Sequence, residues 1–367
     1  MSDQGPLEQE IRDLIARRGP LSVSHYMDLC LAHPQYGYYV CRDPIGASGD
    51  FITAPEISQM FGELIGLWMT AVWRLMGSPA GLRVVELGPG RGTLMADAMR
   101  AAQAVPPFVA AIGGIHLVEI NAALRARQAE TLARLPETPQ WHPTLGEVPD
   151  GPTIIIANEF FDALSVHQAV KRGDGWHERM VHVDADGHLG YTLAQEPIPH
   201  FERLLPKHLP DAHDDELFEW RSDQMAFDVG KRIGRANGAA LIIDYGHIRS
   251  DTGDTFQAAA RHAFTDPLHA PGFADLTAHV DFQALGLAAG AMGAAVHGPM
   301  GQGEWLRRLG IVERAQALKA HATAAQRHDI DAALDRLTGA GRTTMGELFK
   351  VMALADPRLG PLPGFDP

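Results

Sequence analysis

Runs of apolar residues that stop abruptly at polar ones recur along the chain and predict the strands of a sheet. The longer runs are rich in Val, Ile and Leu without polar alternation, which is typical of parallel strands that are buried on both faces. The predicted strands are residues 82–87, 115–119, 140–142, 152–157, 239–246 and 349–354. Helical segments separate most of them, and this order predicts an α/β fold.

Apolar residues spaced three and four apart predict amphipathic helices before and between these strands. The predicted helices are residues 7–18, 25–32, 57–77, 121–135, 221–237 and several stretches within 303–337. The segment 57–77 carries a broad stripe of Met, Trp and other apolar side chains, which predicts that it packs in the core.

Three regions of different pattern predict the organisation of the chain. Residues 1–80 form a helical N-terminal region, whose loop at 35–56 has the composition of a lid or substrate surface, or of a hairpin packed on the domain. Residues 81–164 and 236–356 form the core with the sheet. Residues 165–235 form an insert that begins with strand and turn signals, and we expect it to be a substrate arm.

The first long strand runs directly into three alternating glycines. Gly88, Gly90 and Gly92 follow Glu86, and a helical run begins at Thr93. Glycine permits positive φ and a close approach of the backbone to a ligand, and the N–H groups that open the helix face the same crevice. The pattern therefore predicts a cofactor loop.

The charge of Glu86 distinguishes between possible cofactors. A dinucleotide loop usually reads G-x-G-x-x-G and holds a pyrophosphate, whereas the last interval here is shorter. A carboxylate before the loop repels pyrophosphate and attracts an ammonium group. A second carboxylate, Glu119, ends the next strand, where it can bind both hydroxyls of a ribose. S-adenosylmethionine has both an ammonium group for Glu86 and ribose hydroxyls for Glu119. An NAD-type loop and a glycine turn without a ligand stay open as alternatives.

The expected cofactor-binding residues lie at these strand ends. They are Glu86, Gly88, Pro89, Gly90, Gly92, Thr93, Glu119, Ile120, Glu147 and Asn158. Glu147 follows the edge strand, where an acid could meet an adenine amino group, and a merely solvated acid is its alternative. Asn158 follows the strand at 152–157, so it reaches the same edge of the sheet as the glycine loop.

Composition narrows the possible partners, compartment and metal content of the protein. The 367 residues include 31 Lys and Arg against 45 Asp and Glu, a net charge of −14, which argues against nucleic acid and favours a basic protein or peptide partner. Cys30 and Cys41 have no metal or disulfide spacing, which fits a reducing compartment. With no secretion leader and no apolar run of membrane length, we expect a cytoplasmic, bacterial-type protein without a membrane span. The loop histidines at 262, 269 and 279 lack a close pairing, and we expect no metal.

Several motifs in combination resemble the MidA-like class I methyltransferases over most of the chain. They are Gly19-Pro20 to Gly37-Tyr38-Tyr39, GDFITAPE at 49–56, ELGPGRG at 86–92, NEFFDAL at 158–164, IDYG at 243–246, DLTAHVDF at 275–282 and MGELFK at 345–350. The glycine loop alone does not identify this family, whereas the combination is specific.

The resemblance implies a Rossmann-like sheet in the order 3-2-1-4-5-7-6 with strand seven antiparallel, and S-adenosylmethionine over the ends of strands one and four. Mitochondrial members of the family are protein arginine methyltransferases that assist assembly of respiratory complex I, and they methylate arginine symmetrically on one of its subunits. A protein substrate is therefore implied for this chain too, although its target need not be the same subunit. The sequence does not predict an oligomeric state.

Methyl transfer to arginine requires carboxylates that hold the guanidinium and accept its proton. We expect Glu159 and Asp162 to be catalytic, because they follow the strand at 152–157. A surface acid and a helix N-terminal carboxylate are the respective structural alternatives. The expected substrate-binding residues are Asp50, Phe51, Thr53, Glu56 and Asp244.

Two functions of other classes stay open. One is an NAD-linked oxidoreductase on a similar sheet, which the loop spacing and Glu86 disfavour. The other is an assembly factor or chaperone that retains the cofactor site without turnover.

Overall fold

The computed structural model describes residues 5–41, 53–203, 205–207, 209, 212–260, 263–341 and 343–365. The chain divides into two compact units. The larger unit comprises Ile52–Phe161, Asp223–Ile248 and Phe282–Pro367, and the smaller unit comprises Met1–Phe51, Asp162–Ser222 and Arg249–Asp281.

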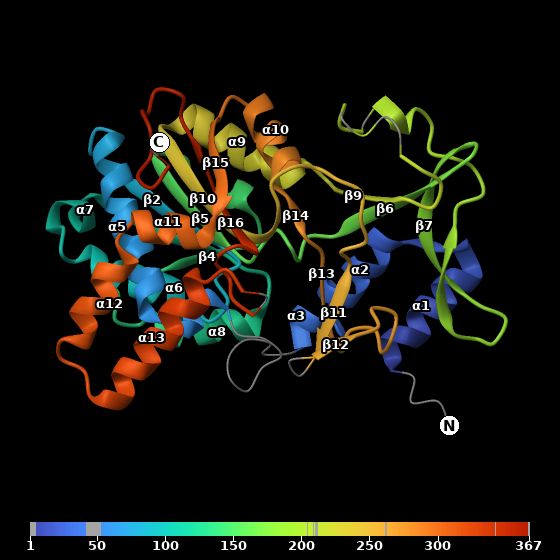
Figure 1. Ribbon diagram of the computed structural model, residues 1–367, viewed down its shortest axis with the longest axis horizontal. Helices are drawn as coiled ribbons and strands as arrows, with labels where there is room; N and C mark the ends of the chain where they lie inside the picture. Colours follow the sequence, from blue (N-terminus) through green and yellow to red (C-terminus); the bar gives the residue numbers. More distant parts are fainter. Residues whose placement is uncertain are drawn as a thin grey trace. The chain divides into compact units, whose positions relative to one another are not determined.

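A mostly parallel sheet is the centre of the larger unit (Figure 1). Its strands are β2 (Leu82–Leu87), β3 (Ile112–Val118), β4 (Gln140–His142), β5 (Thr153–Asn158), β10 (Gly238–His247), β15 (Ala295–Gly301) and β16 (Phe349–Ala355). They follow the order β15-β16-β10-β5-β2-β3-β4; β16 is antiparallel to both neighbours, and the other pairs are parallel. Numbered along the chain and read from β4, this is the expected order 3-2-1-4-5-7-6 with strand seven antiparallel.

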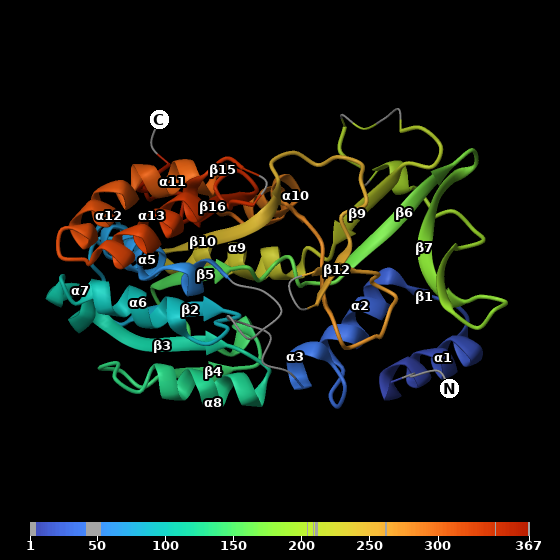
Figure 2. The same ribbon diagram turned by 60° about the horizontal axis from the view of Figure 1, so that its bottom comes forward.

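Helices cover both faces of this sheet, which explains why its strands lack polar alternation. Every residue of β5 is buried. The helical elements of this unit are α4 (Ala54–Ile57), α5 (Gln59–Leu75), α6 (Thr93–Ala102), α7 (Pro106–Ala111), α8 (Ala122–Thr131), η1 (Leu145–Glu147), α9 (Gln224–Ala236), α10 (Phe282–Ala291), α11 (Gln302–Arg308), α12 (Ile311–Lys319) and α13 (Ala324–Thr338). Helices α5, α6 and α11 to α13 share one hydrophobic core with the strands, whereas α9 and α10 pack on each other and on β10 (Figures 1 and 2).

The smaller unit combines helices with two antiparallel sheets. Its elements are α1 (Pro6–Arg18), β1 (Leu21–Ser22), α2 (Val23–Ala32), α3 (Tyr38–Cys41), β6 (Val166–Arg172), β7 (Gly175–Val183), β8 (Leu189–Leu193), η2 (Phe201–Arg203), β9 (Leu217–Arg221), β11 (Gln257–Ala260), β12 (Ala263–Thr265), β13 (Asp275–Thr277) and β14 (Val280–Asp281). One sheet has the order β1-β7-β6-β9 with β8 also on β7, and the other has the order β12-β11-β13. Helices α1 and α2 bury Leu7, Ile11 and Tyr26 in a core with Val166 and Val181. In the described part of the chain, no helix has the length and hydropathy that a membrane crossing requires.

The boundaries of the two units differ from the expected ones. Helix α5, expected in an N-terminal region of residues 1–80, packs in the larger unit against α6. Helix α9, expected at the end of the insert at 165–235, packs against β10 of the larger unit. The apolar stripe of each helix is buried against the sheet-bearing unit, and this burial decides where the helix belongs.

Three stretches depart locally from the predicted elements. The helix expected at 57–77 is interrupted at Ser58, which has an extended backbone and accepts a hydrogen bond from the Met60 N–H as the N-cap of α5. The helical stretch at 303–337 consists of three helices, with breaks at Gly310 and at the capping box that begins with Thr323. The segment at 251–283, expected to be loop-like, contains β11 to β14.

Helices α5 and α6 approach each other closely at two glycines. A Cβ on Gly66 would lie 2.2 Å from the Ala98 carbonyl oxygen, and one on Gly62 would lie 2.7 Å from the Asp97 Cβ. These two glycines are one turn apart on α5, so together they form the surface on which α6 packs. The short contact at Gly66 involves backbone, which cannot move aside as a side chain would.

We predict that Gly66→Ala lowers the free energy of unfolding by about 1 to 3 kcal/mol, because overpacking outweighs the roughly 1 kcal/mol by which Ala favours a helix. Urea denaturation monitored by circular dichroism measures the change. Gly290→Ala in α10 is the matched control, since a Cβ there would come no closer than 3.9 Å to the Val296 Cγ2. The control should match or exceed the wild-type stability. Equal stabilisation by both substitutions would contradict the packing explanation.

Candidate active site

The turn after β2 has a backbone conformation that glycine adopts far more readily than other residues. Gly88, Gly90 and Gly92 have φ angles of 58°, 52° and 81°. A Cβ on Gly88 would lie 2.8 Å from Cδ2 of Phe160, so a larger residue does not fit there. The Gly92 N–H donates to the Pro89 carbonyl at 2.7 Å and closes the turn directly before α6. The predicted loop therefore forms at the carboxyl end of β2.

Glu86 places a carboxylate in nonpolar surroundings at the end of β2. The residue is 3% exposed, and no group in the described part of the chain donates a hydrogen bond to its Oε2. Burial raises the pKa of Glu86 to about 8. Because an ionised carboxylate without a partner is costly to bury, this position favours a ligand that brings a cation or a hydrogen-bond donor.

Glu119 follows β3 and is held by its own loop and by Gln128 of α8. Its Oε1 accepts from the Asn121 N–H at 2.8 Å, and its Oε2 accepts from Gln128 Nε2 at 3.2 Å. Burial raises the pKa of Glu119, and the hydrogen bonds from Asn121 and Gln128 offset part of the effect. The same Gln128 amide donates to the Gly90 carbonyl at 2.7 Å, and its Oε1 accepts from Trp141 Nε1 at 2.7 Å. One side chain thus ties the glycine turn, Glu119 and the edge strand together.

Two further predicted residues lie nearby in the sequence but are more exposed. Ile120, directly after Glu119, has 56% of its surface exposed, which provides an apolar face beside a carboxylate. Glu147 is exposed in η1, and its Oε1 accepts a hydrogen bond from Thr144 Oγ1 at 3.3 Å.

The end of β5 presents a carboxylate on a strained backbone. Glu159 has a φ of 49°, which is unusual for a residue with a side chain. Its N–H donates to the Ile243 carbonyl at 2.9 Å, and its Oε1 accepts from the Ala54 N–H at 3.1 Å and from Asn158 Nδ2 at 3.0 Å. These bonds fix the direction of the Glu159 carboxylate. In the described part of the chain, Asn158 Oδ1 is buried and has no hydrogen-bond partner.

Asp244, expected to bind substrate, is completely buried and supports the segment after β5. Its Oδ2 accepts from the N–H groups of Phe160 and Phe161 at 3.2 and 2.9 Å, and its Oδ1 accepts from the Tyr245 N–H at 3.0 Å. Through these bonds Asp244 fixes the backbone that follows Glu159. Its role in substrate binding stays a prediction.

Glu56 of α4 lies next to Thr93, the first residue of α6. The Thr93 hydroxyl donates to Glu56 Oε1 at 2.5 Å, so a residue expected in the lid and one expected at the cofactor are in contact. Thr53 is 9% exposed and is the N-cap position of α4, although its side chain makes no capping hydrogen bond. Asp50 and Phe51 lie outside the described residues.

Asp162, the second predicted catalytic residue, belongs to the smaller unit and is 6% exposed. Its carbonyl accepts from the Ala278 N–H at 3.2 Å and from Arg221 Nη2 at 3.2 Å. Burial, followed by the charges of Asp275 and Asp162, raises the pKa of Tyr39. Asp162 is therefore part of a buried polar group, and its predicted catalytic role stays untested.

One residue that shapes this site carried no signal in the sequence. Gln128 lies in the middle of α8 and is completely buried, but a glutamine in a helix usually indicates a solvated position. Phe160 lies in the motif at 158–164 and was not expected at the site, although it packs against the glycine turn. Among the residues with described coordinates, no group of three or more His, Cys, Asp or Glu is arranged to hold a metal ion.

A sheet in this order, with a glycine turn after its first strand and carboxylates at the ends of its first two strands, defines a class I methyltransferase. The model of a family of S-adenosyl-L-methionine-dependent methyltransferases matches residues 64–300. The chain belongs to this family.

Two relatives and one solved structure are similar to this protein over nearly its whole length. The mitochondrial protein arginine methyltransferase NDUFAF7 homolog of Drosophila melanogaster is 38% identical, over 96% of this chain and 85% of that protein. The mitochondrial protein arginine methyltransferase NDUFAF7 of Danio rerio is 36% identical, over 93% of this chain and 84% of that protein. A crystal structure of a COG1565 superfamily member from Burkholderia thailandensis, described as a likely methyl transferase and bound to S-adenosyl-homocysteine, matches with a TM-score of 0.83 at 28% identity, over 100% of this chain and 96% of that one.

The chain is therefore an S-adenosylmethionine-dependent methyltransferase, which excludes the NAD-linked alternative. The residues fit this cofactor: its ammonium group suits the buried Glu86 carboxylate, and the turn at Gly88 brings backbone rather than side chain to the crevice.

We predict that Glu86→Gln changes how the stability of the ligand-free protein depends on pH. The folded protein holds the Glu86 proton up to a pKa of about 8, whereas the unfolded chain releases it near 4.5. Glu86 therefore lowers the free energy of unfolding as pH rises from about 5 to 8, by at most about 1.4 kcal/mol per pH unit. The Gln variant should lack this decrease and gain stability relative to wild type toward pH 8.

Urea denaturation at pH 5.5, 6.5, 7.5 and 8.5 measures the difference. Glu313→Gln, which replaces an exposed glutamate of α12, controls for the substitution itself. If the wild-type and Glu86→Gln curves ran parallel across this range, the folded protein would not retain the Glu86 proton.

Proposed function

We propose that this methyltransferase transfers methyl groups to arginine side chains of a protein. The 36 to 38% identity to relatives named protein arginine methyltransferases, over more than nine-tenths of this chain, is the main support for an arginine acceptor. The net charge of −14 supports a basic partner as well, because an acidic protein attracts arginine-bearing segments.

In the proposed complex, residues at the ends of three strands each contact a different part of the cofactor. Glu86 receives the ammonium group, Gly88 to Gly92 and Thr93 line the amino-acid end with backbone, and Glu119 binds the ribose hydroxyls. Ile120 offers an apolar face to the adenine, and Glu147 and Asn158 are further contacts. When bound, S-adenosylmethionine supplies the activated methyl group.

Glu159 has the chemistry that an arginine acceptor requires. A guanidinium is cationic at neutral pH and cannot act as a nucleophile until its positive charge is localised and a proton leaves. The Glu159 carboxylate holds the guanidinium by charge-assisted hydrogen bonds and accepts the proton from its terminal nitrogen as the nitrogen becomes methylated. The donors Ala54 N–H and Asn158 Nδ2 keep Oε1 in place, so that the carboxylate is oriented before the acceptor arrives.

Other parts of the proposal stay predictions. They are the catalytic role of Asp162, the substrate contacts of Asp50, Phe51, Thr53, Glu56 and Asp244, and the cytoplasmic location. A subunit of respiratory complex I is the first acceptor to examine, because the resemblance to MidA-like proteins implies it.

The direct test incubates the protein with methyl-labelled S-adenosylmethionine and a cell lysate, and maps the labelled residue by mass spectrometry. Label on an arginine of one or a few proteins supports the proposal. Label confined to another residue type or to small molecules refutes it. If the protein binds the cofactor and labels nothing, an assembly factor without turnover becomes the better description.

With the labelled segment as a peptide substrate, we predict that Glu159→Gln lowers kcat/KM by about 10²- to 10⁴-fold, the usual contribution of a general base. The Gln side chain can still accept from the Ala54 N–H, so affinity for S-adenosylhomocysteine should change less than about threefold. Steady-state kinetics and isothermal titration calorimetry measure the two quantities, with Glu313→Gln as the control. Loss of cofactor affinity in Glu159→Gln would assign the residue to binding instead.

A further inference from the structure

A second concave site lies at the opposite edge of the sheet of the larger unit. Gly151 and Pro152 precede β5 and Asn237 precedes β10, so a pocket lined by these residues is at the amino ends of the strands. The pocket has a volume of about 620 Å³. The candidate active site lies at the carboxyl ends of the same strands. The pocket is also lined by Leu145 and Gly146 of η1, the two residues before Glu147.

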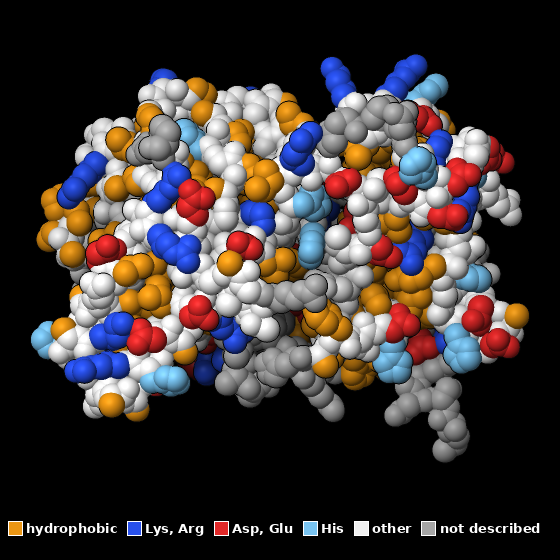
Figure 3. All heavy atoms as spheres, in the orientation of Figure 1, with side chains coloured by type: hydrophobic (Ala, Val, Ile, Leu, Met, Phe, Trp, Pro, Cys, Tyr) orange, Lys and Arg blue, Asp and Glu red, His pale blue; other side chains and the backbone are white. Residues whose placement is uncertain are grey.

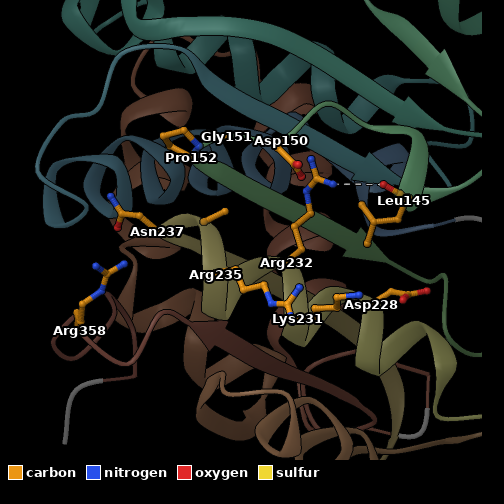
Figure 4. A pocket seen from close by; sticks show the side chains of 12 residues that line it. Leu145, Asp150, Gly151, Pro152, Asp228, Lys231, Arg232, Arg235, Asn237 and Arg358 are labelled. Atoms are coloured by element: carbon orange, nitrogen blue, oxygen red, sulfur yellow. Dashed lines mark hydrogen bonds between the residues drawn. The ribbon is translucent and has the colours of Figure 1, made fainter.

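Basic side chains dominate this pocket, which we call the basic pocket. Lys231, Arg232 and Arg235 come from the last turns of α9 and Arg358 comes from the segment after β16, against two acids, Asp150 and Asp228 (Figure 4). On the face drawn in Figure 3, by contrast, acidic and basic side chains are intermingled. A concentration of positive charge is unexpected in a protein with a net charge of −14.

The cations of the basic pocket differ in how they are held. The Arg232 guanidinium donates to the carbonyls of Leu145 and Val148 at 3.4 and 3.0 Å and to that of Pro149, which fixes it against the segment before β5 (Figure 4). Arg358 forms an ion pair with Asp356, to whose Oδ1 and Oδ2 it donates at 2.9 and 2.5 Å, so its charge is neutralised. Lys231 and Arg235 are exposed on α9, within reach of a ligand.

Two buried arginine nitrogens at the pocket, Arg83 Nε and Arg232 Nε, lack hydrogen-bond partners in the described part of the chain, and so does Nε2 of His116, whose Nδ1 lies 3.0 Å from His142 Nε2. Arg83 borders the pocket, because a Cβ on Gly151 would lie 3.7 Å from its Nε. Burial and then the charges of His142, Arg83 and Arg232 lower the pKa of His116 to about 4. Buried donors are normally satisfied, so the two arginine nitrogens indicate an acceptor that the described part of the chain does not supply.

The helix dipole alone does not explain this arrangement. A helix C-terminus stabilises cations, which accounts for basic residues at the end of α9. It does not account for Arg83 on β2 or His116 on β3, which belong to other elements and carry unsatisfied nitrogens.

We propose that the basic pocket binds a small molecule through its phosphate groups. Phosphate oxygens accept several hydrogen bonds at once, and arginine is the side chain best suited to donate them in pairs. Basic side chains of α9 line a concave space and Arg83 of β2 lies beside it, an arrangement that suits a compact anion better than an extended acidic peptide. The volume admits more than one phosphate group, so pyrophosphate is an appropriate probe.

The test measures binding of inorganic pyrophosphate by isothermal titration calorimetry at constant ionic strength. The protein is first saturated with S-adenosylhomocysteine, which occupies the active site. We expect one pyrophosphate per chain, and at least tenfold weaker binding in the double variant Lys231→Gln/Arg235→Gln. The double variant Arg74→Gln/Arg134→Gln removes the same charge from exposed positions of the same unit that do not line the pocket, and it should bind as wild type does.

Three outcomes would overturn the proposal: no binding to wild type, equal weakening in the two double variants, or tighter binding of a hexaglutamate peptide than of pyrophosphate. A second measurement does not depend on any variant. Bound pyrophosphate should raise the pKa of His116, which histidine ring signals in an NMR titration report. An unchanged His116 pKa at saturation would place the anion elsewhere.

Discussion

The buried carboxylate of Glu86 is the constraint on which the chemistry of this protein depends. Its pKa is raised by burial, and one of its oxygens has no hydrogen-bond partner in the described part of the chain. A fold that only needed stability would replace such a group by an apolar one. The carboxylate is therefore best explained by a cationic ligand, and the Gly88 turn beside it brings backbone close enough to bind the rest of that ligand.

The parallel sheet brings further polar side chains to the same edge as Glu86. Because β2, β3 and β5 run in the same direction, Glu86, Glu119 and Glu159 all arrive at one edge. Two buried polar side chains then hold the pieces in place: the Gln128 amide ties Glu119 to the glycine turn, and the Asp244 carboxylate anchors the backbone after Glu159. Hydrogen bonding by buried side chains thus supplies the rigidity that methyl transfer, a reaction governed by alignment, requires.

The two edges of the same sheet carry different sets of side chains. Glu86, Glu119 and Glu159 lie at the carboxyl ends of the strands, together with Arg125, whose Nε donates to the Glu119 carbonyl at 2.7 Å, whereas Arg83 and the basic residues of α9 lie near the amino ends. An excess of acidic residues over the whole chain does not predict this separation, since net charge says nothing about placement. The anion site that we propose and the cofactor site therefore use different surfaces of the same unit.

Patterns along the sequence predict the sheet, its cofactor loop and the family. Apolar runs mark strands such as β5 because both faces are buried, and alternating glycines mark a turn because other residues rarely adopt positive φ. The folded chain is needed to show which unit α5 and α9 join, that Gln128 is buried and connects three elements, and that Asp244 supports the backbone. These features depend on contacts between residues far apart in the chain, and local periodicity carries no information about such contacts.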